Sequence, residues 1–145
     1  MTKYIRQVAF VAAMAVGVSS ILHAEETEDR CSSTTLKGLY VFNTAGFNVV
    51  AGVAQPAAIL ELIRFNGDGS LSVPAATVSM NGTIIRPAGG VGTYSVAADC
   101  TGKIVFGPPG PTFDFVLAPG GSTLYMIRTG PGSPVVQGQA HRLSN

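Results

Sequence analysis

The chain has 145 residues, and its 18 glycines and 9 prolines indicate frequent turns. Charged residues make up 12 % and apolar residues 46 %, which excludes a disordered polyelectrolyte, and so short a chain supports one folded core. The formal net charge of +1 gives no reason to expect nucleic acid as a partner.

Residues 1–24 have the pattern of a secretory signal peptide. Lys3 and Arg6 precede an uncharged run over residues 8–22, and acidic residues follow Ala24. The alternative is a transmembrane anchor, but the run is shorter than the ~20 residues that span a bilayer. We therefore expect cleavage after Ala24, no stable membrane span afterwards, and export to the periplasm or the extracellular space.

The N-terminal segment 25–35 contains Cys31, and the second cysteine of the chain is Cys100. Both would lie in an oxidising compartment after export, which favours a disulfide. For a separation of 69 residues, the chain-entropy model gives a stabilisation of about 4 kcal/mol. The alternative is a redox-active thiol pair, but the sequence has no C-x-x-C motif and no neighbouring histidine to lower a thiol pKa.

From Leu36 onwards, short β-rich runs alternate with clusters of glycine, proline, asparagine and aspartate, which predicts an all-β domain over residues 36–145. Asn81-Gly82 is the sharpest turn signal, because a two-residue type I′ turn needs positive φ at both positions. The expected strands are residues 36–45, 57–66, 70–80, 83–87, 91–97, 103–107, 112–118, 122–129 and 134–143.

Sequential hairpins of this kind predict a single antiparallel up-and-down β-barrel of about eight strands, since closure removes exposed sheet edges. A β-sandwich of the same strands is the alternative. A transmembrane barrel is disfavoured, because a chain with no tryptophan and four tyrosines has little from which to build aromatic girdles. After removal of the signal peptide, His141 is the only histidine, so we expect no multi-histidine metal site.

Several segments form a recognisable series. They are Cys31, residues 36–42 (LKGLYVF), 63–69 (IRFNGDG), 92–96 (GTYSV), 99–102 (DCTG), 113–117 (FDFVL), Gly120-Gly121 and 138–142 (GQAHR). Over nearly all of residues 25–145 the chain resembles a group of small exported bacterial proteins, mostly of unassigned function. Their barrels are similar to the calycin and allene oxide cyclase type. The resemblance implies a lipocalin-like barrel that can hold an apolar cavity, but no cyclase active-site residue carries over.

Glu61 is an individual feature, because the group has a small residue at this position. Strand alternation places it on one face with Ile63 and Phe65, and Leu60, Leu62 and Arg64 lie on the other face. If the first face is the interior, Glu61 is desolvated unless Arg128 or Arg86 pairs with it, and it is a candidate catalytic acid or base. If the second face is the interior, Glu61 is solvated.

Aromatic side chains along the strands are candidate lining residues of a cavity for an apolar ligand. We single out Tyr94, Phe115 and Tyr125, with Arg128 as a charged neighbour. The other members of the set are Tyr40, Phe42, Phe106 and Phe113. The alternative is that these side chains simply fill the barrel.

The sequence contains none of the common catalytic or phosphate-binding motifs, so we expect a non-enzymatic module without a cofactor. It would bind a small apolar ligand or act as an interaction module of the cell envelope. One alternative is a cofactor-free isomerase or cyclase that uses Glu61. Another is an oligomeric envelope component, since the low charge is consistent with a homo-oligomer.

Overall fold

The computed structural model describes residues 30–87, 89–108, 110–131 and 134–144. The expected signal peptide, residues 1–24, and residues 25–29 lie outside the described residues. The elements are η1 (Ser33–Thr35), β1 (Lys37–Val50), β2 (Val53–Asn66), β3 (Ser70–Met80), β4 (Thr83–Ile85), β5 (Gly90–Val96), β6 (Thr101–Phe106), β7 (Thr112–Leu117), η2 (Pro119–Gly121), β8 (Thr123–Arg128) and β9 (Val135–Ser144).

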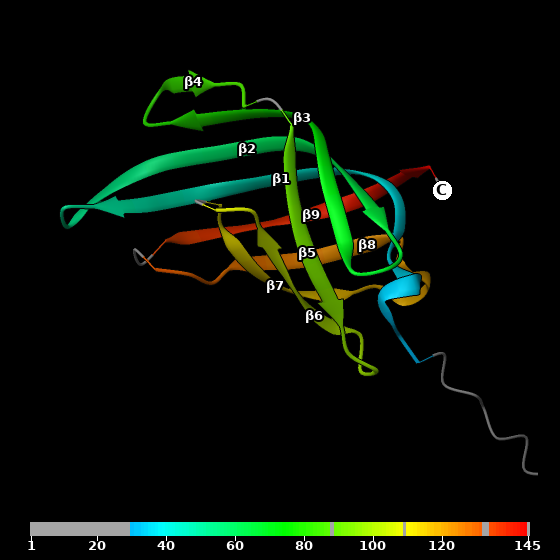
Figure 1. The fold of residues 1–145 in the computed structure, drawn as a ribbon. Coiled ribbons are helices and arrows are strands. Elements are labelled where there is room, and N and C mark those ends of the chain that lie inside the picture. Colours follow the sequence, from blue (N-terminus) through cyan, green and yellow to red (C-terminus); the bar gives the residue numbers. More distant parts are fainter. Residues whose placement is uncertain (1–29, 88, 109, 132–133, 145) are drawn as a thin grey trace, which may run out of the picture.

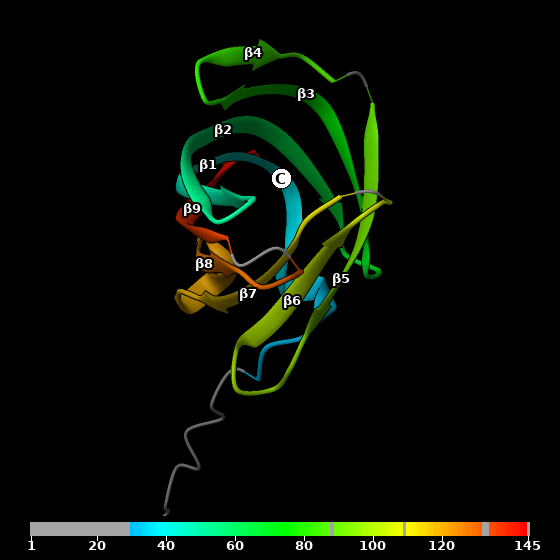
Figure 2. The same ribbon diagram turned by 90° about the vertical axis from the view of Figure 1, so that its left-hand side faces the viewer.

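Eight of the nine strands form a closed antiparallel barrel, which confirms the predicted fold class (Figure 1). Neighbours in the barrel follow the chain order, and the ring closes where β1 pairs with β9. The short strand β4 pairs only with the end of β3 and stays outside the ring (Figure 2). Among the described helices, none is long and apolar enough to cross a membrane.

Local turn chemistry explains how consecutive strands pair. Asn81 and Gly82 have φ values of 48° and 85°, and Met80 pairs with Thr83 across them, as expected for the predicted two-residue turn. Ala51 and Gly52, with φ values of 49° and 79°, make an equivalent turn between β1 and β2.

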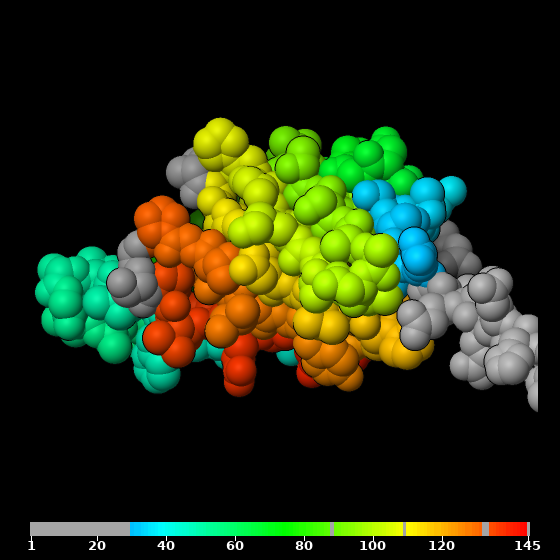
Figure 3. All heavy atoms as spheres, turned by 90° about the horizontal axis from the view of Figure 1, so that it is seen from below, coloured from blue at the N-terminus to red at the C-terminus, as the bar shows by residue number. Residues whose placement is uncertain are grey.

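The β1–β2 hairpin is longer than the sequence predicted. Strand β1 continues to Val50, although the sequence predicted its end at residue 45. Strand β2 begins at Val53, although its predicted start was residue 57. The hairpin tip projects beyond the rest of the barrel (Figures 1 and 3). Its tip exposes Phe47, Val50 and Val53. This extension was not predicted, because the first residue of its turn is Ala51, and alanine rarely adopts positive φ and gives no turn signal.

Large side chains fill one end of the barrel, which we call the closed end. Tyr40, Phe65 and Tyr94 form two edge-to-face pairs, with centroids 5.1 Å and 5.0 Å apart. Leu36, immediately after η1, is fully buried among the core residues. The Cys31–Cys100 disulfide predicted from the sequence joins the segment before η1 to the β5–β6 turn at this end.

Hydrogen bonds tie the closed end together. The Tyr40 hydroxyl donates to the Gly121 carbonyl at 2.6 Å and accepts from Arg142 Nε at 2.8 Å. The Tyr94 hydroxyl oxygen lies 2.8 Å from the Leu36 carbonyl oxygen and accepts from the Gly67 amide at 2.9 Å. The polar atoms of these two buried rings are therefore satisfied, and burial raises the pKa of both phenols.

Candidate functional site

Glu61 lies on the inner face of β2, which decides between the two interpretations of this strand. Ile63 and Phe65, two and four residues further along, are 0 % and 1 % exposed. Leu60 on the opposite face is 56 % exposed, and Arg64 is also exposed. The face with Glu61 is therefore the interior, and the face with Leu60 and Arg64 meets solvent.

Glu61 borders a hollow of about 400 Å³, which we call the Glu61 pocket. Apart from Glu61, its described lining consists of glycine and apolar residues: Val73, Ala76, Pro87, Gly89, Gly90, Val91, Phe106, Gly107, Pro108 and Pro111. One carboxyl group in a concave and otherwise apolar wall is a typical arrangement for a site that orients a small ligand.

The course of β3 makes room for this pocket. β3 pairs with β5 only from Ser70 to Val73, and its far end pairs with β4 instead, from Val78 to Met80. The pocket lies where these partners diverge, with walls from the start of β5 and the end of β6. The β5–β6 turn that holds Cys100 is at the other end of these strands, so the pocket lies away from the closed end.

Glu61 differs from the other acidic side chains of the described chain. Asp68 and Asp99 accept hydrogen bonds from Ser70 and Thr101, which lower their pKa values. Asp114 has its pKa lowered by a hydrogen bond from Lys103, 2.9 Å away. Glu61 has no hydrogen-bond or ion-pair partner among the described residues, and burial raises its pKa from the ordinary 4.5 to about 7.

This shift has a direct physical cause. Burial removes water from the carboxylate, and within the described part of the chain nothing replaces it, so the neutral acid is favoured. A pKa near 7 means that both protonation states are populated at neutral pH. The group can therefore donate or accept a proton, and as a carboxylate it can hold a positively charged ligand group.

Arg128 does not pair with Glu61. It faces the interior from β8, on the same side of the strand as Leu124 and Met126, and its Nη1 donates to Asn48 Oδ1 at 2.8 Å. Asn48 in turn lies with its Nδ2 3.1 Å from Met80 Sδ. Arg86, the other arginine considered as a partner, is exposed and precedes Pro87 of the pocket wall.

Two of the three aromatic candidates, Tyr94 and Phe115, are buried and fill the barrel. Tyr94 packs against Phe65 at the closed end, and Phe115 is 3 % exposed. A side chain added at Gly102 would collide with the Phe115 ring, so this glycine is what lets the ring lie against β6. Phe106 is different, because it packs on Phe113 while also lining the Glu61 pocket.

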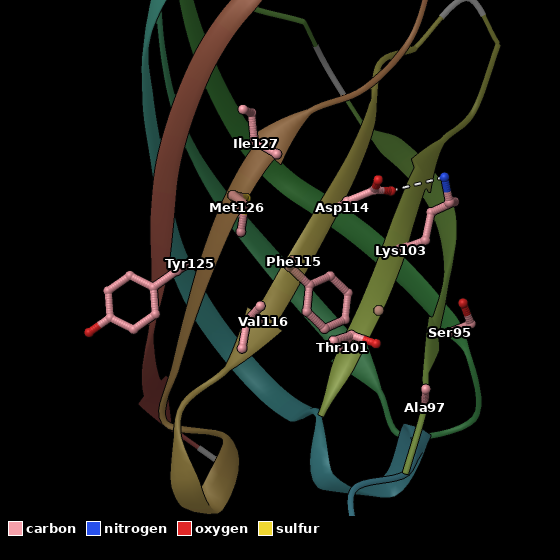
Figure 4. A pocket seen from close by; sticks show the side chains of 11 residues that line it. Ser95, Ala97, Thr101, Lys103, Asp114, Phe115, Val116, Tyr125, Met126 and Ile127 are labelled. Atoms are coloured by element: carbon pink, nitrogen blue, oxygen red, sulfur yellow. Dashed lines mark ion pairs between the residues drawn. The ribbon is translucent and has the colours of Figure 1, made fainter. Parts of the chain in front are cut away.

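Tyr125 is on the outer face of the barrel and is 58 % exposed, so it does not line the interior. With Val116, Ile127 and the Lys103–Asp114 pair it lines an outer groove of about 520 Å³ (Figure 4). Phe115 also borders this groove. Its charged residues already neutralise each other, and so the groove offers a ligand no unsatisfied charge.

The remaining features carry less chemistry. Two other outer hollows, of about 440 and 550 Å³, have no charged residue in their linings. His141 is exposed on β9, with Nδ1 3.2 Å from Thr123 Oγ1. No group of three or more potential metal-ligating side chains occurs within the described ranges.

Sequence reasoning named Glu61 and, among the aromatic candidates, Phe106, but not the rest of the pocket wall. Most of the described pocket wall comes from Pro87, residues 89–91, residues 106–108 and Pro111, which the sequence predicted as turns and strand ends. Their meeting depends on the divergence of β3 from β5, which begins directly after Val73, at Pro74. A proline has no backbone N–H to donate to a neighbouring strand, so it signals an interruption here but not which segments close the pocket.

Comparison with family models, curated proteins and solved structures found no match to this chain. The resemblance to small exported bacterial barrels therefore stays a prediction.

Proposed function

We propose that this protein binds a small, mainly apolar molecule in the Glu61 pocket. The observation that carries the proposal is a single unpartnered carboxyl group in an otherwise apolar hollow of about 400 Å³. This volume lies within the range of small-molecule sites, roughly 300–1,000 Å³, and the apolar wall supplies the hydrophobic part of the binding free energy.

The contrast with the outer groove supports the choice of site. The outer groove is larger, but it lies on a face of the sheet and contains a paired lysine and aspartate. The Glu61 pocket enters the barrel wall beside Phe106 and contains a charge that the described chain leaves without a partner. A mainly apolar ligand that carries a hydrogen-bond donor or a positive charge would compensate the desolvation of Glu61, and the outer groove has no such cost to compensate.

A dye titration tests the proposal. The uncharged fluorescent probe N-phenyl-1-naphthylamine should bind the wild-type protein with increased emission. Ala76 lines the pocket and Ala75, the adjacent residue on the outer face, is exposed. Ala76→Trp should abolish binding by filling the pocket, and the matched control Ala75→Trp should leave it unchanged. Equal binding by both variants would contradict the proposal.

Acid–base catalysis on the bound molecule is a second candidate function. It is favoured by the placement of Glu61 on the inner face with a pKa of about 7, close to the value suited to proton transfer at neutral pH. A cofactor-free isomerase or cyclase of this kind would lose turnover in Glu61→Gln while retaining binding. Retained turnover in that variant would contradict this candidate.

We also infer that the protein is exported, to the periplasm or the extracellular space, because the Cys31–Cys100 disulfide is compatible with an oxidising compartment. Mass measurement of the protein isolated from the exported fraction should find a disulfide and loss of residues 1–24. Free thiols in that fraction would contradict the inference.

The homo-oligomer and the envelope interaction module form a separate proposal. Exposed apolar side chains on the outer surface support it, since Val53, Val91 and Val135 are 61 %, 67 % and 67 % exposed. Light scattering at increasing concentration should report association, and a monomer throughout would contradict the oligomer.

A further inference from the structure

We propose that the occupant of the Glu61 pocket is a cationic amphiphile, an apolar body that carries one positively charged nitrogen. This inference rests on the proposed function and names the chemical class of its ligand. The geometry that leads to it is a carboxyl group on a concave wall without a basic partner among the described residues.

The elements around Glu61 contribute no compensating charge. On β1 its cross-strand partner is Phe42, and on β3 it faces Ala76 and Val73. The walls from β5 and β6 present Gly90 and the ring of Phe106. Hydrophobic contact with these side chains can hold an apolar body beside the carboxyl group.

The two arginines considered as partners of Glu61 do not neutralise this site, and Arg64 lies on the outer face of β2. Arg86 is exposed just before Pro87, and Arg128 across the interior donates to Asn48. The only ion pair within the described residues joins Lys103 to Asp114 on the outer face. A ligand that brings its own positive charge would therefore supply the missing partner of Glu61.

The electrostatics favour a cation over a neutral or anionic ligand. A carboxylate in surroundings of low polarity interacts strongly with an opposite charge at short range, because little water screens the pair. A second carboxylate would be repelled. An alcohol with the same apolar body as the cation could make a hydrogen bond to Glu61, but it would leave the negative charge of the carboxylate uncompensated. The binding preference should therefore run from cation to alcohol to anion.

Matched probes test this preference. n-Octyltrimethylammonium and 1-octanol share an eight-carbon chain and differ in charge, and the quaternary nitrogen does not titrate. Each is measured at pH 8 by displacement of N-phenyl-1-naphthylamine from the wild type, Glu61→Gln and Asp114→Asn. The last variant is the control, because it removes the same charge from the outer face.

The expected result is specific to Glu61. Glu61→Gln should weaken binding of the ammonium probe by more than tenfold and leave binding of octanol nearly unchanged, and Asp114→Asn should bind both like the wild type. Wild-type affinity for the ammonium probe should also fall as the pH is lowered through the pKa of Glu61 and then level off near the affinity of Glu61→Gln, because the carboxylate is protonated. The octanol affinity should not follow pH.

The outcomes separate this inference from the proposed function. If octanol binds but the ammonium probe binds no more tightly, and Glu61→Gln changes neither affinity, the ligand class is wrong and the pocket remains a binding site. If the dye does not bind the wild type, or binds Ala76→Trp as well as Ala75→Trp, the proposed function is wrong as well. The pH dependence of the wild-type affinity for the ammonium probe also tests whether the charge of Glu61 matters, and it needs no substitution.

Discussion

The two ends of the barrel use buried polar groups in opposite ways. At the closed end, the hydroxyls of Tyr40 and Tyr94 are each matched by carbonyl, amide or guanidinium partners. In the Glu61 pocket, an acid is partly buried without a partner among the described residues. The hydrogen-bonded tyrosines stabilise the fold. The Glu61 carboxyl group, which lacks a partner, marks the surface where a ligand could supply one.

Removal of the disulfide should have the largest effect on the closed end. We expect the double substitution Cys31→Ser with Cys100→Ser to lower the free energy of unfolding by about 4 kcal/mol, because the bond closes a 69-residue loop. Urea denaturation measures the change. The folded double variant should still bind N-phenyl-1-naphthylamine, since the pocket lies elsewhere. A loss of stability below about 1 kcal/mol would contradict this role.

Truncation of one phenylalanine at each end sharpens the comparison. Phe65→Ala should lower the unfolding free energy by about 3 to 4 kcal/mol, because the ring is 1 % exposed and contacts two other rings. Phe106→Ala should lower it by about half as much, since Phe106 is only partly buried and borders the pocket. Equal losses in urea denaturation would show that the two ends are packed alike.

Glu61→Gln should stabilise the protein at pH 8. The folded pKa of Glu61 is about 7 against an ordinary 4.5, so between these pH values the folded state binds more protons than the unfolded state. Stability therefore falls as the pH rises through this window. The full shift corresponds to about 3 kcal/mol, and solvent contact of the carboxyl reduces our expectation to about 2 kcal/mol.

Urea denaturation at pH 5 and pH 8 checks this prediction. The wild type should lose stability between the two pH values relative to Glu61→Gln, and Asp114→Asn should show no such gain at pH 8. Destabilisation of Glu61→Gln at pH 8 would mean that Glu61 has a partner in the folded protein.

The smallest effect expected is that of one hydroxyl at the closed end. Tyr94→Phe should lower the unfolding free energy by about 1 kcal/mol, because Gly67 and Leu36 lose their hydrogen-bond partner. The control Tyr125→Phe removes a hydroxyl from an exposed ring and should change stability by less than about 0.5 kcal/mol. Thermal unfolding of both variants measures the difference, and indistinguishable midpoints would contradict the assignment.

The sequence predicted the features that depend on neighbouring residues. Strand 70–80 and the Asn81-Gly82 turn were predicted with the bounds that the structure has. The barrel and the disulfide also followed, from sequential hairpins and from two cysteines in a chain predicted to be exported. These are local or compositional signals.

The features that depend on distant segments were not predictable. Leu60 and Leu62 make the outer face of β2 as apolar as the inner one, so alternation alone could not place Glu61. The register shift between Leu62 and Arg64 places an extra residue in β3, between Ser72 and Ala75, where Pro74 has no backbone N–H. The proline signals an irregularity in the strand, but not its effect on the pocket. The pocket wall depends on how four strands and two loops meet, which no single segment encodes.

A carbon-13 NMR titration of the Glu61 side-chain carboxyl most directly tests whether this group lies unpartnered in an apolar pocket. Glutamate-selective labelling, with Glu61→Gln to assign the signal, follows the carboxyl from pH 3 to pH 9. We predict a midpoint near 7. A midpoint near the ordinary 4.5 would show that the group is solvated or paired, and would contradict both the proposed site and its preference for a cation.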